Sequence, residues 1–181
     1  MILAASVFLV ILAYGYLMYK LGVVSLRNPL TVKDRALDIV KVAIPVAYVE
    51  EMIFRYGIFH MLLLGYFKLE YLYAALISSV FFSLTHFWWG MYSKSTEYKG
   101  VDKYYLAFGL FLFAMVLSKL YLLNFWYGVI FHAGSIYAVQ LHQGIYKTEE
   151  ETNWKLFDEG HQLLRCPAIW GVLITYLLIL G

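Results

Sequence analysis

The stretch Val49–Arg55 places two carboxylates and a guanidinium inside an apolar run that extends from about Ile39 to Phe67. A run of this length is typical of a helix that crosses a membrane. Charges at that depth are costly, so they usually pair, face the interior of a helix bundle and mark a functional site. Glu51 and Arg55 are four residues apart, on one helix face, and are predicted to form an ion pair. Glu50 points about 100° around the helix, and the spacing pairs it with no residue of its own helix.

Two histidines lie inside other apolar runs. His86 ends the string Phe-Ser-Leu-Thr-His, and His132 begins the string His-Ala-Gly-Ser-Ile. With a rise of about 1.5 Å per residue, Glu50, His86 and His132 all fall within roughly 10 Å of the bilayer midplane. One carboxylate and two imidazoles from three different helices can therefore meet at one depth.

Such a trio has the parts needed to hydrolyse a peptide bond with water. A glutamate in a low-dielectric cavity can take a proton from water. One histidine can orient that water or pass the proton on. A second histidine can donate to the oxygen that becomes negative when a carbonyl group is attacked.

Other interpretations of the same three residues remain open. Two histidines and a glutamate form a known catalytic zinc set. However, the helical H-E-x-x-H spacing is absent and no acidic residue stands beside His86 or His132, so we expect no metal and no cofactor. A proton-coupled carrier would also use such groups, although about six spans without an internal repeat are few for a transporter. A purely structural role, bracing neighbouring helices, is the third alternative.

The composition indicates an integral membrane protein. The chain has 181 residues, of which 62% are hydrophobic and 14% charged, whereas soluble domains are about half apolar and about a quarter charged. The net charge of +2 is too small to indicate a nucleic-acid partner. The single cysteine, Cys166, excludes an internal disulfide. The expected partners are the lipid bilayer and a membrane-associated protein or peptide substrate.

The pattern predicts an all-α, polytopic helix bundle in one domain, residues 1–181, with about six spans. Segments that would face the inside, if the N-terminus is outside, hold eleven Lys and Arg, against two in the outer segments. The positive-inside rule therefore predicts an outside N-terminus, in a cell membrane. The predicted spans are Met1–Val24, Ile39–Phe67, Tyr71–Ser93, Tyr104–Leu123, Phe125–Ile145 and a short last run, Ala168–Gly181.

At these residues the sequence resembles the CPBP family, the CAAX-protease and bacteriocin-processing intramembrane proteases, also called the ABI family. Its marks are E-E-x-x-x-R, then F-x-x-x-H, then H-x-x-x-N or a variant, on successive core helices. Here they read Glu50-Glu51-x-x-x-Arg55, Phe82-x-x-x-His86 and His132. The resemblance covers about residues 39–140, which we expect to form the catalytic core.

The resemblance implies a glutamate-type intramembrane endopeptidase. By residue, it implies that Glu50 is the general base on water and that His86 helps to hold and activate this water. It implies that His132 stabilises the oxyanion. Glu51 with Arg55 would be the structural pair that fixes the helix, and the phenylalanine of the second motif would serve packing.

One position departs from the family pattern. The asparagine expected four residues after the third-motif histidine is Ile136 here, and isoleucine cannot donate to an oxyanion. Ser135, Asn124 and Gln140 are the candidate replacements, with Ser135 the possible oxyanion partner. The departure keeps an alternative function open: a catalytically silent membrane scaffold or bacteriocin-immunity protein of the same fold.

Overall fold

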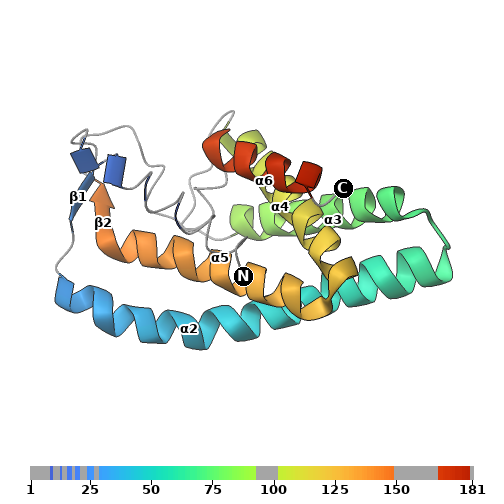
Figure 1. Cartoon of the computed structure of the whole chain (residues 1–181), viewed down its shortest axis with the longest axis horizontal. Coiled ribbons are helices and arrows are strands. Elements are labelled where there is room, and N and C mark those ends of the chain that lie inside the picture. The colour runs from blue at the N-terminus through green and yellow to red at the C-terminus, as the bar shows by residue number, and fades with distance from the viewer. Residues whose placement is uncertain are drawn as a thin grey trace. The chain divides into compact units, whose positions relative to one another are not determined.

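The computed structural model describes residues 24–26, 29–92, 102–148 and 167–179, together with six single positions before residue 24. Most of the predicted first span therefore lies outside the described residues, as do residues 149–165 of the polar segment and Cys166. The described elements are β1 (Val24–Leu26), α2 (Pro29–Glu51), η1 (Met52–Tyr66), α3 (Tyr71–Tyr92), α4 (Asp102–Leu123), α5 (Phe125–Ile145), β2 (Tyr146–Thr148) and α6 (Pro167–Ile179) (Figure 1).

The helical fold class predicted from the sequence is confirmed. The sequence did not predict β1 and β2, two three-residue strands that pair antiparallel with Val24 opposite Thr148. It also predicted that the second span begins at about Ile39. Instead, α2 begins at Pro29 and runs through Pro45 without a break. Proline suits the first turn of a helix because the missing N–H has no partner there in any case.

The chain divides into two compact units, and each is described by itself. The first consists of Met1–Tyr48 and Val129–Leu163. In α2 its buried residues include Ile39, Ala43 and Ala47, which are four residues apart and therefore lie along one helix face. The prediction of a single domain over residues 1–181 stays a prediction.

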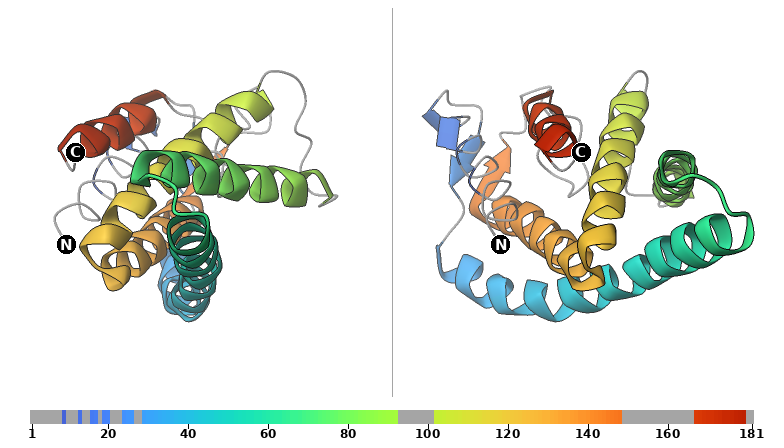
Figure 2. Two further views of the ribbon diagram at one scale, coloured as in Figure 1. Left: turned by 90° about the vertical axis from the view of Figure 1, so that its right-hand side faces the viewer. Right: turned by 45° about the vertical axis from the view of Figure 1, so that its right-hand side comes forward.

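The second unit consists of Val49–Gly128 and Leu164–Gly181 and holds the helices η1, α3, α4 and α6. Helix α4 contacts the other three (Figure 2). Its residues Ala114, Val116 and Leu117 are completely buried, as a central helix requires. An apolar cluster joins three of these helices; its buried members are Phe59, Leu63, Ala74, Ala75 and Met115.

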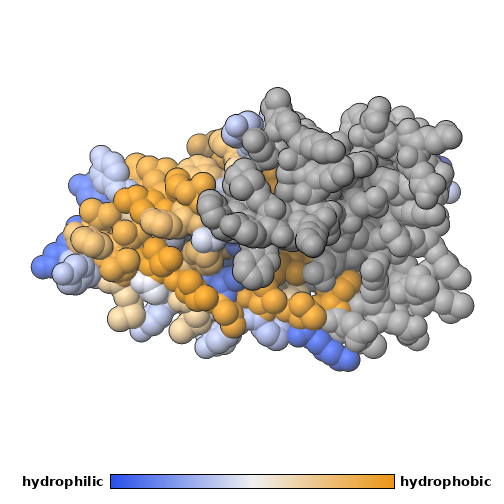
Figure 3. Space-filling model, turned by 180° about the vertical axis from the view of Figure 1, so that it is seen from behind, coloured by the Kyte–Doolittle hydropathy of each residue, from blue (hydrophilic) through white to orange (hydrophobic). Residues whose placement is uncertain are grey.

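Among the described residues, one helix is long and apolar enough to cross a membrane, α4 between Tyr104 and Leu123. Two shorter apolar helices, Tyr71–His86 and Ile169–Ile179, accompany it. The six predicted spans therefore remain a prediction. Apolar side chains nevertheless cover much of the described surface seen in Figure 3. On α3 the exposed large apolar residues lie on one side of the helix and include Leu72, Tyr73, Ile77, Val80, Phe81 and Leu84.

The second predicted span is α-helical only up to Glu51 and then continues as the π-helix η1. A π-helix bonds each N–H to the carbonyl five residues back, and long examples are rare. Its turn is wider, so its buried residues Phe54, Phe59 and Leu63 recur at intervals of five and four. The change of helix type falls at the charged motif, and π-helical geometry often occurs at functional sites.

A left-handed residue lies two positions after the last residue of the π-helix. Lys68 has a φ of 52°. On either side of it, the Phe67 N–H donates to the Leu62 carbonyl at 3.0 Å and the Leu69 N–H donates to the Leu63 carbonyl at 3.0 Å. These bonds satisfy carbonyl groups that the end of the helix would otherwise leave open. Glycine adopts this backbone conformation without the steric cost that a side chain brings.

Replacing Lys68 with glycine should therefore stabilise the protein. We expect Lys68→Gly to raise the free energy of unfolding by up to about 1 kcal/mol, because the left-handed conformation no longer strains a Cβ. Thermal unfolding in detergent measures the change. Phe67→Gly is the matched control: Phe67 has a right-handed φ of −79°, so glycine there should lower the melting temperature. Equal effects of the two substitutions would contradict this account.

Candidate active site

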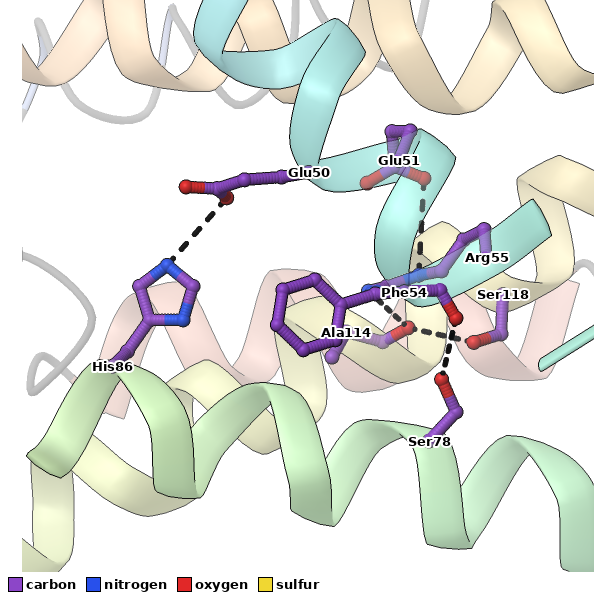
Figure 4. A network of polar contacts seen from close by, with 8 residues as sticks. All are labelled: Glu50, Glu51, Phe54, Arg55, Ser78, His86, Ala114 and Ser118. Atoms are coloured by element: carbon purple, nitrogen blue, oxygen red, sulfur yellow. Dashed lines mark hydrogen bonds and ion pairs between the residues drawn. The ribbon is translucent and has the colours of Figure 1, made fainter. Parts of the chain in front are cut away.

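The site is built at the junction of α2 and η1. Glu50 and Glu51 are the last two residues of α2, and Arg55 lies in the first turn of η1. The two neighbouring carboxylates leave the chain in different directions: Glu50 points toward His86 on α3, whereas Glu51 points toward Arg55 (Figure 4). Two glutamates that are adjacent in sequence therefore have different surroundings.

Glu51 and Arg55 form an ion pair inside the unit. Arg55 Nε lies 3.7 Å from Glu51 Oε2, and both side chains have an exposed fraction of 0%. Arg55 Nη2 also donates to the Ala114 carbonyl of α4 at 3.1 Å, and its Cζ lies 4.7 Å from the centre of the Phe82 ring. Because attraction between charges is strong where water is absent, these contacts hold η1 against both α3 and α4.

Serines complete the contacts between these helices. Ser78 of α3 donates to the Phe54 carbonyl of η1 at 3.0 Å, and Ser83 of α3 donates to the Ala107 carbonyl of α4 at 2.7 Å. Ser118 of α4 bonds within its own helix, to the Ala114 carbonyl at 3.0 Å. Small hydroxyl residues allow helix backbones to approach closely and bond across the contact.

Glu50 and His86 form the second polar pair. His86 Nε2 lies 3.5 Å from Glu50 Oε2, and the two side chains keep exposed fractions of 18% and 25%, in contrast to the sealed Glu51 and Arg55. The Glu50 oxygen that faces His86, Oε2, is itself covered, so the exposed surface of the pair lies on other atoms of the two side chains.

A second contact of His86 shows which ring nitrogen carries a hydrogen. His86 Nδ1 lies 2.8 Å from the Phe82 carbonyl, which can only accept, so Nδ1 carries the hydrogen. In the neutral ring, Nε2 then presents a lone pair toward Glu50. Two acceptors 3.5 Å apart can share one proton or can both accept hydrogen bonds from one water molecule. Either state is suited to moving a proton.

Phe82 lies in contact with both polar pairs. Its ring centre is 4.1 Å from that of His86 and 5.0 Å from that of Phe54, in an edge-to-face arrangement. It is 1% exposed. The family resemblance implied a packing role for Phe82. The structure makes that role specific, because the ring touches the Arg55 guanidinium and the His86 imidazole.

The structure describes the surroundings of His132 and Ser135 within their own unit. His132 lies on α5 and is 3% exposed. Ser135 Oγ donates to the Phe131 carbonyl, four residues back, at 2.8 Å, so its hydrogen is already engaged. Asn124, another candidate donor, accepts the Trp126 N–H at 2.9 Å at the start of α5. The side chain of Gln140 lies outside the described residues.

No group of three or more His, Cys, Asp or Glu residues that could hold a metal ion is found in the described part of the chain. That hydrolysis needs no metal stays a prediction.

A family comparison adds to this geometry. The model of the family described as type II CAAX prenyl endopeptidase Rce1-like matches residues 33–137, more than half of the chain. The chain belongs to the Rce1-like family. This confirms the suspected kinship with the CAAX proteases, and the family is membrane-embedded. The match includes Glu50, Glu51, Arg55, His86 and His132. No curated protein and no solved structure matches the chain.

Several residues of this Rce1-like site were not singled out by the sequence analysis. Ser78 and Ser83 donate hydrogen bonds to backbone carbonyls on two other helices. Their spacing relative to Phe82 along the helix could have predicted that they face the neighbouring helices. The hydrogen bond from Arg55 to the Ala114 carbonyl could not be predicted, because every residue has a backbone carbonyl and the sequence does not show which one accepts.

Breaking the buried ion pair should unfold the protein more readily. Arg55→Met leaves the Glu51 carboxylate buried without its cation, which typically costs about 3 to 5 kcal/mol. We expect a large fall in melting temperature in detergent. The double variant Glu51→Gln with Arg55→Met removes both charges and should recover much of the loss. Arg55→Met with wild-type stability would contradict a structural role for the pair.

Removing the Phe82 ring should affect turnover more than stability. Phe82→Leu keeps an apolar side chain of similar volume and should cost less than about 1.5 kcal/mol, while His86 loses the ring that fixes its orientation. We expect the rate of peptide cleavage to fall by about tenfold. Phe113→Leu is the control, since this buried phenylalanine also contacts Phe82. Equal losses in both variants would assign Phe82 to packing alone.

Proposed function

We propose that this Rce1-like protein is a glutamate-type intramembrane endopeptidase that hydrolyses a peptide bond in a membrane-associated protein or peptide. The observation that carries the proposal is the pairing of Glu50 with His86 at 3.5 Å, with both side chains partly exposed, beside a sealed ion pair. Family membership supports CAAX-type protease activity in general. The assignment of individual roles is the proposal.

Water is the proposed nucleophile. One water molecule donates its two hydrogens to the Glu50 carboxylate and to His86 Nε2, and this leaves an oxygen lone pair directed at the substrate carbonyl. The carbon–oxygen bond forms as Glu50 takes a proton from the water. His86 cannot rotate freely, because Nδ1 is held by the Phe82 carbonyl. The orientation of the water is therefore fixed before the substrate arrives.

Attack on the carbonyl produces a tetrahedral intermediate with a negative oxygen. We assign the donor for this oxygen to His132, on the strength of the family resemblance, with Ser135 a possible second donor if its bond to the Phe131 carbonyl is exchanged. Collapse of the intermediate breaks the carbon–nitrogen bond. The proton held between Glu50 and His86 then passes to the leaving amine, which restores the starting state of the pair.

Neutralising Glu50 tests the mechanism. Glu50→Gln keeps the shape of the side chain but removes the base, so turnover should fall by about 10²- to 10⁴-fold. The probe is a quenched-fluorescent peptide that ends in a prenylated Cys-aliphatic-aliphatic-X sequence, and its unprenylated form tests whether the lipid is needed. Glu70→Gln, which changes an exposed glutamate before α3, is the control. Wild-type turnover by Glu50→Gln would overturn the mechanism.

Two further measurements separate the alternatives. Treatment with a chelator should leave cleavage unchanged, and loss of activity that Zn²⁺ restores would make Glu50 or the histidines metal ligands. In a strain that lacks the protein, complementation by Glu50→Gln would favour the non-enzymatic scaffold or immunity function. Failure of Glu50→Gln to complement, with rescue by Glu70→Gln, would favour the protease.

A further inference from the structure

Gly128 lies in the first turn of α5, next to the Glu51 carboxylate. A methyl group added to it would meet Glu51 Oε2 at 3.0 Å, Glu51 Cδ at 3.7 Å and the Leu117 carbonyl oxygen at 3.8 Å. The first of these distances is shorter than real carbon–oxygen contacts normally reach. The absence of a side chain at this position is therefore what allows α5 to approach the Glu51 carboxylate.

The carboxylate has little freedom to move out of the way. A glutamate carboxylate is usually the mobile end of a flexible side chain, but Glu51 is completely buried. The oxygen nearest to Gly128 is Oε2, the same atom that lies 3.7 Å from Arg55 Nε. A displacement must therefore disturb the ion pair or move the backbone at Glu51, to which Glu50 is covalently joined.

The approach also places Glu51 at the positive end of a helix. The start of α5 is fixed by Asn124, whose Oδ1 accepts the Trp126 N–H at 2.9 Å and whose carbonyl accepts the Tyr127 N–H at 3.0 Å. The aligned peptide dipoles of a helix favour a negative charge at its first turn. The Glu51 carboxylate is thus held between the Arg55 guanidinium and the first turn of α5.

We infer that Gly128 is a positioning residue for the hydrolysis proposed above. By admitting the first turn of α5 to the Glu51 carboxylate, it fixes the junction of α2 and η1 and so the direction in which Glu50 faces His86. The inference rests on the proposed function. Gly128 lies outside the three sequence motifs that contain Glu50, His86 and His132. Glycine lowers helix stability. At position 128 this cost is offset because only glycine leaves room for the Glu51 carboxylate.

The test compares two Gly→Ala substitutions in the full chain. In Gly128→Ala the added methyl presses on Glu51, and we expect kcat for the prenylated quenched-fluorescent peptide to fall by about tenfold or more with KM nearly unchanged. Gly171→Ala in α6 is the matched control. An added methyl at Gly171 meets nothing within 4 Å, so this variant should cleave like the wild type. Equal kcat values for the two variants would overturn the inference.

A second variant shows whether the effect passes through Glu51. Glu51→Asp withdraws the carboxylate by one methylene group and makes room for the methyl. The double variant Gly128→Ala with Glu51→Asp should therefore have a higher kcat than Gly128→Ala alone, and the two changes should be non-additive in melting temperature. Additive losses in both quantities would overturn the inference.

Cleavage of the peptide by the wild-type chain shows whether a failure concerns the role of Gly128 or the proposed function itself. If the wild-type chain cleaves no peptide, the proposed function fails. If the wild type cleaves and Gly128→Ala cleaves equally well, the proposed function stands and only the role of Gly128 is lost.

Discussion

The buried pair of Glu51 and Arg55 is the constraint on which the described site depends. Moving a carboxylate and a guanidinium out of water costs several kcal/mol for each ion, and the pair is tolerated only if further contacts satisfy both groups. Two neighbouring helices contact Arg55, through the Ala114 carbonyl of α4 and the Phe82 ring of α3. The first turn of α5 lies next to Glu51, because Gly128 has no side chain there. The junction of α2 and η1 is therefore fixed.

This fixed junction gives two adjacent glutamates different tasks. Glu51 is sealed and paired, which suits a structural role. Glu50, one residue earlier, keeps a quarter of its side chain exposed and faces His86. The ion pair holds the backbone in place next to Glu50, and Glu50 faces His86. A base that must accept and release protons benefits from this separation, since a charged partner as close as Arg55 would weaken it as a base.

The wide turn of η1 and the small residues of α3 have a common effect. Both change how closely the helix backbones pack around the charged motif. The serines of α3 let it approach η1 and α4 and bond to their carbonyls. In the π-helical η1 the buried residues Phe54, Phe59 and Leu63 follow one another at intervals of five and four. The polar contacts that result hold the second motif, Phe82 and His86, against the first.

The sequence by itself determined the membrane character, the helical class, most helix limits and the motif residues. Charges inside apolar runs are too costly to be accidental, so Glu50, Glu51, Arg55 and His86 could be recognised without coordinates. Only the tertiary structure decided which atoms these residues meet. The π-helical continuation of α2, the Ala114 acceptor, the tautomer of His86 and the closeness of Gly128 to Glu51 depend on backbone groups and on distances between helices. Such features arise from packing in three dimensions, and residue types along the chain do not encode them one by one.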